Sequence, residues 1–211
     1  MKVIAPKVSF NLPSKNFHEI YEEEDPELEL CEVNESIFEN EVLPRIRLYK
    51  VIIKNCRFNN TDFSNIDITD VIFKNCDLSN TKMNKSSIHR TLFSNCKLIG
   101  VDFTHSNLGN ITFDDSILNL VAFGESKLEK VSFQNCALES SDFYECKFKG
   151  IELKACNIDG VNFERTSLKG IDISTSTFES IILSVEDLKG CKVSSYQAIQ
   201  FASLLGLEVV D

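Results

Sequence analysis

Hydrophobic residues recur at every fifth position along most of this chain. From Val33 to Val193, every position whose number ends in 3 or 8 holds Phe, Leu, Ile, Val or Met. Two positions earlier, the residue is usually small or β-branched, as at Cys56, Thr61 and Ser106. The other three positions of each five-residue unit are mostly polar. Two residues in every five are therefore expected to point into a core.

Neither a helix nor a flat strand has this period. A helix would spread the pattern around its axis, and a strand would turn the bulky residue to the opposite face at each repeat. A chain that turns a corner after every five residues keeps both inward positions inside, and four corners complete a coil of about 20 residues. The last position of the unit is often Asn or Gly, and both residues tolerate the conformations that turns need.

The repeats resemble those of the pentapeptide-repeat family, whose pattern is A(D/N)LXX. The match is seen in TDF at 61–63, VDF at 101–103, SDF at 141–143 and VNF at 161–163, and it covers about residues 31–195. The resemblance implies an all-β solenoid, a right-handed quadrilateral β-helix of pentapeptide repeats with about eight coils and a C-terminal capping helix. Coils stacked at about 4.8 Å would make a rod of roughly 40 Å.

This interpretation divides the chain into three segments. Residues 1–30 are expected to be an N-terminal capping extension, residues 31–195 the β-helix, and residues 196–211 a C-terminal helix and short strand used for dimerisation. Residues 20 apart in the β-helix would share a face, and residues 10 apart would lie on opposite faces. Since most core Phe positions end in 3 and many Leu positions end in 8, Phe rows should line one pair of opposite faces and Leu rows mainly the other.

The N-terminal extension shows weaker local signals. Ser14 is a suitable N-cap for a short helix containing Phe17, Ile20 and Tyr21. The acidic stretch 22–30 is expected to be a solvated connection over the first coil, and a specific acidic contact is the alternative.

At the C-terminus the five-residue period gives way to a helical pattern. Ser194 or Ser195 can serve as the N-cap and Gly206 as the stop signal, and residues 207–211 could form a final strand. The helix is more apolar than covering the last coil requires, so we expect a C2 homodimer; covering the coil alone is the alternative. The quinolone-resistance members of the family dimerise through such a helix, which by resemblance implies the same here. The expected interface comprises Tyr196, Ile199, Phe201, Leu204, Leu205 and Leu207.

Little in the sequence points to catalysis or to a cofactor. All eight cysteines lie at the small inward positions without a CxxC spacing, which favours free buried thiols over metal ligands or disulfides and fits a reducing cytoplasm. The three histidines are far apart, and no nucleotide-binding, hydrolase or metalloprotease motif occurs. We therefore expect no cofactor, no metal and no enzymatic activity. The chain has no apolar stretch long enough to span a membrane and a poor signal-peptide candidate, so a cytoplasmic location is expected.

The charge of the chain is strongly acidic and unevenly distributed. There are 32 acidic and 22 basic side chains, a formal net charge of −10, which argues against direct binding to nucleic acid. Residues 101–211 alone hold 17 acidic and nine basic side chains. On the Phe-lined faces we expect a partner-binding acidic surface, while one Leu-lined face is rich in lysine; solubility alone is the alternative. The residues of the expected acidic surface are Asp102, Asp114, Asp115, Glu125, Asp142, Glu145, Glu152, Glu164 and Asp172.

The resemblance also suggests a function. The chain is similar to Qnr-type quinolone-resistance members of the family, and its unbroken register is most like the loop-free, Gram-positive variety. This implies a non-catalytic DNA mimic that binds DNA gyrase or topoisomerase IV and protects it from fluoroquinolones, without the loops found in other members. The alternative is a generic pentapeptide-repeat scaffold or interaction protein with a different partner.

Overall fold

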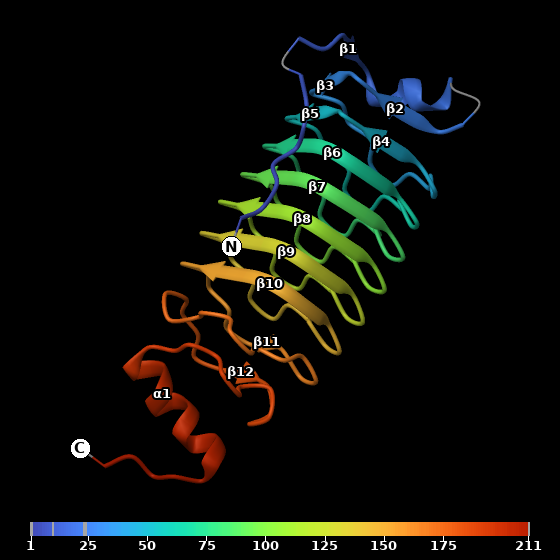
Figure 1. Ribbon diagram of the computed structural model, residues 1–211. Coiled ribbons are helices and arrows are strands. Elements are labelled where there is room, and N and C mark those ends of the chain that lie inside the picture. Colours follow the sequence, from blue (N-terminus) through green and yellow to red (C-terminus); the bar gives the residue numbers. More distant parts are fainter. Residues whose placement is uncertain (1, 10, 23–24, 211) are drawn as a thin grey trace.

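The protein is a right-handed β-solenoid of about eight coils with a C-terminal helix, as the repeat predicts (Figure 1). The computed structural model describes residues 2–9, 11–22 and 25–210. Its longest strands are β6 (Asp67–Lys74), β7 (Ser87–Ser94), β8 (Asn107–Asp114), β9 (Lys127–Gln134) and β10 (Lys147–Lys154). Each strand pairs in parallel with the next in a register shifted by 20 residues, so that Phe113 lies beside Phe93 and Phe133.

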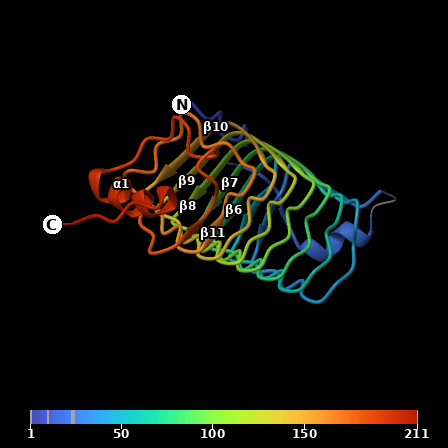
Figure 2. The same cartoon turned by 90° about the horizontal axis from the view of Figure 1, so that it is seen from below.

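Shorter elements complete the coils and cover their two ends. Figure 2 shows the coils stacked behind one another, with a short 3-10 helix at one end and the C-terminal α-helix at the other. The remaining strands are β1 (Ser14–Lys15), β2 (Glu27–Glu29), β3 (Glu32–Asn34), β4 (Arg47–Tyr49), β5 (Ile52–Lys54), β11 (Val161–Asn162) and β12 (Ile181–Ile182). The helices are a 3-10 helix at Phe17–Tyr21, α1 (Ser195–Ala202) and a 3-10 turn at Ser203–Leu205.

The corners of the coils are made by residues in the left-handed backbone conformation. Asn60 and Asn80 have φ values of +59° and +58°, and asparagine tolerates this region better than most residues. Gly100 occupies the same corner one coil later with φ +67°. A Cβ added to Gly100 would lie 2.7 Å from Oδ1 of Asn80, so close stacking as well as the positive φ favours glycine here.

Asparagine corner residues also bond from coil to coil. The side-chain amide of Asn95 donates to Oδ1 of Asn75 over 2.9 Å, and Asn75 donates to Asn55 over 3.1 Å. On another corner, Asn80 donates to Asn60 over 3.1 Å. Such ladders of identical amides reinforce the parallel backbone pairing.

The Asp or Asn that precedes many bulky residues has a structural role in the turn. Its side-chain oxygen accepts the backbone N–H two residues further on, as between Asp62 and Ser64 over 3.0 Å and between Asp102 and Thr104 over 2.9 Å. This local bond holds the chain in a turn, and it accounts for the D/N position of the repeat.

The core is built from stacked aromatic rings, as predicted from the Phe positions. Phe93, Phe113 and Phe133 stack with ring centroids 5.0 Å apart at each step and interplanar angles of 10° and 7°. A second stack runs through Phe103, Phe123, Phe143 and Phe163. The two stacks meet edge to face, since Phe113 and Phe123 lie 6.3 Å apart at 75°. Offset-stacked and edge-to-face pairs are the favourable geometries for aromatic rings.

Small polar residues inside the coil satisfy backbone groups of the neighbouring coil. Oγ of Ser106 accepts the backbone N–H of Ser86 over 2.9 Å, and Oγ of Ser126 accepts that of Ser106 over 2.9 Å. Hydroxyl groups can therefore occupy the small inward position without leaving an unpaired buried group.

The N-terminal segment covers the first coil with aromatic packing. Phe17, in the 3-10 helix, is buried with its ring 4.8 Å from those of Phe38 and Phe58. The predicted cap at Ser14 is wrong, because Asn16 is the N-cap and Ser14 belongs to β1. The acidic stretch 22–30 is also more than a connection, because β2 within it pairs with β4.

Residues 2–9 form a strap along the side of the rod, where Figure 1 marks the N-terminus beside β8 and β9. The backbone N–H of Lys7 donates to Oδ1 of Asp70 over 2.9 Å, and that of Ile4 donates to Oδ1 of Asn110 over 3.1 Å. Asp70 is 2% exposed and accepts from Nε and Nη2 of Arg90 over 2.6 and 2.8 Å. Burial alone would raise the pKa of the Asp70 carboxyl, but Arg90 and the Lys7 backbone outweigh it and hold the pKa below its ordinary value.

The C-terminal helix closes the last coil through side-chain amides. Ser194 is the N-cap of α1, and Gly206 ends the following turn with φ +70°, both as predicted. Nε2 of Gln197 donates to the carbonyl oxygens of Ile173 and Ser176 over 2.9 and 2.8 Å. The predicted final strand is wrong for residues 207–210, which are extended away from the coils with no neighbouring strand to pair with; Asp211 lies outside the described residues.

Replacing Phe113 by alanine should lower the free energy of unfolding by about 3–5 kcal/mol, because the ring leaves a cavity within the stack. Equilibrium unfolding in urea measures the change. Thr112→Ala, an outward position of the same strand, should stay within about 0.5 kcal/mol of the wild type. A loss below about 1 kcal/mol for Phe113→Ala would contradict a tightly packed aromatic core.

Asp70→Asn should destabilise the protein near neutral pH by about 3 kcal/mol, because Arg90 loses its partner. Since the pKa of Asp70 is lowered in the folded state, this contribution is present above the ordinary carboxyl pKa of about 3.9 and is lost as pH falls through the folded value. The difference between variant and wild type should therefore shrink in strong acid, as measured by urea unfolding across pH. Asp67→Asn, an exposed carboxylate on β6, serves as control, and an equal loss there would argue against a special role for Asp70.

Candidate functional site

The coil sorts outward side chains onto four faces. Face 1 consists of residues 101–105 and the segments 20 residues before and after, and faces 2, 3 and 4 follow in the same way from residues 106–110, 111–115 and 116–120. Faces 1 and 3 are half a coil apart, as are faces 2 and 4. Any sequence pattern with a period of 20 therefore becomes a stripe along the rod.

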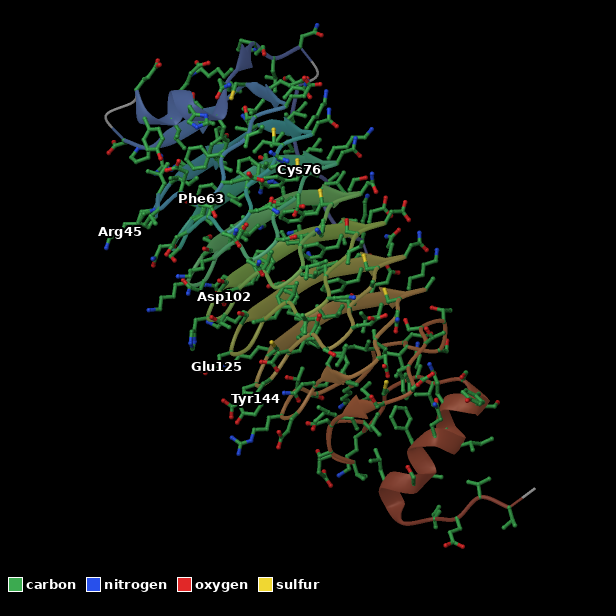
Figure 3. All side chains as sticks on the ribbon, turned by 180° about the vertical axis from the view of Figure 1, so that it is seen from behind. Arg45, Phe63, Cys76, Asp102, Glu125 and Tyr144 are labelled. Carbon is green, nitrogen blue, oxygen red and sulfur yellow. The ribbon has the colours of Figure 1, made fainter. Side chains whose placement is uncertain are left out.

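The nine acidic residues expected to form one surface are divided between two opposite faces. Face 1 carries Asp102, Glu125, Asp142, Glu145 and Glu164, whereas face 3 carries Asp114, Asp115, Glu152 and Asp172. Figure 3 shows Asp102 and Glu125 on the same edge of the rod, with their side chains outward. These two groups alone would not make a continuous surface.

Face 4 supplies the acidic residues that connect them. It carries Glu139, Asp159 and Glu179, and residues 101–190 add no basic side chain to this face. These three residues were not predicted, because the expected acidic surface was limited to the Phe-lined faces. The sequence does contain the signal, since the charges on all four faces can be counted from the 20-residue period. Faces 3, 4 and 1 together form an acidic surface that wraps around the second half of the rod.

Several of these carboxylates are held in fixed positions. Oδ1 of Asp142 accepts the Tyr144 backbone N–H over 3.1 Å and the Asn162 amide over 2.8 Å. Backbone hydrogen bonds from Ser180 and Glu179 lower the pKa of Asp159. The lowered pKa favours the ionised form of Asp159, and the two hydrogen bonds to Asp142 hold its side chain in place.

Other acidic residues differ in how far their charge is compensated. Glu145 forms a 2.6 Å ion pair with Arg165. Within the described part of the chain, Asp114 and Asp115 make no ion pair or side-chain hydrogen bond, so their charge faces solvent uncompensated.

Face 2 has the opposite charge. Over residues 101–190 it carries six lysines against three acidic residues. Lys127 and Lys147 are direct neighbours on β9 and β10, and Lys149 pairs with Glu129 over 2.8 Å. The rod thus has three acidic faces and one basic face in its second half.

The C-terminal helix presents an apolar surface at the end of the rod. Tyr196, Ile199, Leu204 and Leu207 are 70%, 52%, 43% and 57% exposed. Phe201 instead packs inward, with its ring 5.3 Å from that of Phe178. The side chain of Leu205 lies outside the described part of the structure.

The same end holds apolar residues that the sequence analysis did not select. An open groove of about 500 Å³ lies between the last coil and α1 and is lined by apolar side chains, including Val185, Leu188 and Val193. Val209 and Val210 beyond it are 57% and 90% exposed. Together with the helix they extend the apolar surface beyond the six predicted positions.

Residues 2–9, 11–22 and 25–210 contain no group of three or more His, Cys, Asp or Glu side chains arranged to hold a metal ion. All eight cysteines are free thiols, and seven of them are buried. No helix in the described chain is both long and apolar enough to cross a membrane.

Comparison with known proteins defines the class of this solenoid. Residues 46–123 and 86–163 match the family model described as a pentapeptide repeat region. The two matches together span more than half of the chain, which therefore belongs to the pentapeptide-repeat family. No curated protein sequence matches it.

Solved structures place the fold among Qnr-type solenoids. Two trypsin-treated forms of QnrB1, described as a plasmid-mediated fluoroquinolone resistance protein, superpose with TM-scores of 0.51 and 0.52 at 22% identity. Each alignment covers 85% of this chain and 90% of the trypsin-treated QnrB1 chain. HetL, a pentapeptide-repeat protein from Nostoc sp. strain PCC 7120, is also matched, with 14% identity, a TM-score of 0.26, and 84% and 94% of the two chains covered.

Proposed function

We propose that this protein is a non-catalytic DNA mimic that binds DNA gyrase or topoisomerase IV and protects the enzyme from fluoroquinolones. The observation that supports this most directly is the continuous acidic surface on faces 3, 4 and 1 of a narrow rod. The likeness of the fold to QnrB1, a fluoroquinolone resistance protein, adds to it.

The charge density of the acidic surface is close to that of DNA. Over residues 101–190 the three acidic faces carry 12 acidic side chains against Lys154 and Arg165, a net charge of −10. These residues span about 22 Å at about 4.8 Å per coil. One net charge per roughly 2.2 Å is comparable to the one per about 1.7 Å of duplex DNA. A basic groove that holds DNA would therefore also attract this surface.

The lysines of face 2 restrict how the rod could lie in such a groove. Six lysines on one face would be repelled by a basic wall. The rod would therefore bind with faces 3, 4 and 1 toward the groove and face 2 toward solvent. This orientation places the uncompensated carboxylates of Asp114 and Asp115 at the contact.

The apolar end supports a C2 homodimer formed through α1. Two copies joined there would bury Ile199 and Leu207, which are more than half exposed in one chain, and such apolar burial favours association. The acidic halves of the two rods would then be adjacent, doubling the length of the DNA-like surface.

The proposal predicts that the protein restores gyrase supercoiling in the presence of ciprofloxacin. The combined variant Asp114→Asn, Asp115→Asn, Glu125→Gln and Glu164→Gln should require roughly tenfold more protein for the same protection, and protection should weaken as salt is raised. Lys127→Gln with Lys147→Gln on face 2 is the matched control and should protect normally. Full drug inhibition at saturating wild-type protein, or recovery of a different stoichiometric partner, would favour a generic scaffold instead.

The dimer is tested by sedimentation velocity. The wild type should sediment as a dimer, and Ile199→Asp with Leu207→Asp should sediment as a folded monomer, because charges are costly to bury in an apolar interface. Val42→Asp replaces a 72% exposed residue at the other end of the rod and should remain dimeric. A monomeric wild type would refute this interface.

A further inference from the structure

One residue departs from the usual types at the corner that joins face 4 to face 1. In successive coils this corner is occupied by Asn60, Asn80, Gly100, Leu120, Ser140 and Gly160. Leu120 has the left-handed backbone conformation that the corner requires, with φ +61°. Glycine has no Cβ to crowd the backbone there, and asparagine can form a local hydrogen bond that offsets the crowding, whereas leucine has neither property. The leucine therefore makes the corner less stable than an asparagine would.

The side chain of Leu120 is mostly exposed, at 62%. Its neighbours at the same corner are Gly100 one coil earlier and Ser140 one coil later. Because glycine has no side chain and serine has a short one, the leucine projects beyond the corner residues on either side of it. An apolar side chain that is unfavourable in its backbone conformation and projects into solvent is a candidate for a role outside the fold.

A second exposed apolar side chain lies on the same face. Ile117 is 43% exposed, and its partners in the adjacent coils are Lys97 and Ala137. Lys97 is within 3.5 Å of the carboxylate of Asp77, so its charge is already partly compensated. Ile117 and Leu120 belong to one five-residue unit and form what we call the apolar patch.

Carboxylates flank the apolar patch on three sides. Asp115 precedes it in the chain, Glu125 follows it, and Glu139 lies one coil further on. Glu139 is held in place by the side-chain amides of Asn119 and Asn157, which donate to its carboxylate over 3.2 and 2.5 Å. The patch therefore lies on face 4, the middle one of the three acidic faces.

We propose that Leu120 is an apolar anchor that enters an apolar pocket bordered by lysine or arginine in the DNA-binding groove of the type II topoisomerase. This inference rests on the proposed function, because it concerns the same partner. Complementary charge speeds encounter and sets orientation more than it prolongs a complex. Buried side chains ringed by polar groups supply most of the energy at protein interfaces. The patch would thus add lifetime to a complex whose formation depends on the carboxylates.

The test measures association and dissociation rates on purified gyrase and topoisomerase IV by surface plasmon resonance at several salt concentrations. Leu120→Asn should dissociate about tenfold faster than the wild type, because the apolar contact is lost. Its association rate and its salt dependence should match the wild type, since no charge changes. Leu120→Met keeps an apolar side chain and should dissociate more slowly than Leu120→Asn.

Leu30→Asn is the matched control. Leu30 is another leucine at a left-handed corner, with φ +48° and 44% exposure, but it lies near the start of the rod and outside the acidic surface. Its replacement should leave both rates unchanged. Asparagine already occupies the corner of Leu120 at Asn60 and Asn80, so Leu120→Asn should fold and should unfold at a higher urea concentration than the wild type.

The outcomes separate this inference from the proposed function. If the wild type binds but Leu120→Asn dissociates at the wild-type rate, or Leu30→Asn dissociates equally fast, the anchor is refuted and the proposed function stands. Unfolding of Leu120→Asn at a lower urea concentration than the wild type would also refute the anchor, because the leucine would then serve the fold. A wild type that binds neither enzyme would overturn the proposed function and the anchor together.

Discussion

The structure depends on the parallel hydrogen bonding between coils at a constant shift of 20 residues. That register places each side chain directly beside its equivalent in the next coil, as for Phe93, Phe113 and Phe133. Identical groups must then interact favourably with themselves. Phenyl rings stack, asparagine amides form donor–acceptor chains, and serine hydroxyls accept the neighbouring backbone N–H. The recurring residue types of the sequence are those for which such self-contact is stabilising.

Charge is the exception, because stacked like charges repel. Along the rod, acidic residues are held by turn amides or paired with a base one coil away, as in Glu145 with Arg165. Asp114 and Asp115 lack this compensation, and their neighbours one coil away are neutral, since Asp114 lies between Ser94 and Gln134. These two carboxylates therefore contribute nothing to the stacking itself, which agrees with their place in the proposed partner-binding surface.

The sequence allowed the coil, its corners and its aromatic stacks to be predicted because a period of five has few structural solutions. The strap was not predictable in the same way. Its contacts with Asp70 and Asn110 are made by the backbone N–H groups of Lys7 and Ile4. Almost any residue has a backbone N–H group, so such contacts cannot be recognised from the residue types in the sequence. The cap at Asn16 rather than Ser14 is a shift of two residues between chemically equivalent candidates. The acidic residues of face 4 were not predicted, because the acidic surface was assigned only to the two Phe-lined faces and face 4 lies between them.

Gln197 also bears on how long the rod can become. An uncovered final coil would expose a row of carbonyl groups, a template on which another parallel strand could be added. Gln197 occupies the carbonyls of Ile173 and Ser176, and Gln200 donates to the carbonyl of Phe178 over 3.3 Å, so the helix forms a cap that ends a stacking pattern with no internal limit. Without this cap, further coils or other chains could add to the exposed carbonyl groups and extend the rod into a fibre, because the five-residue repeat does not itself limit the number of coils.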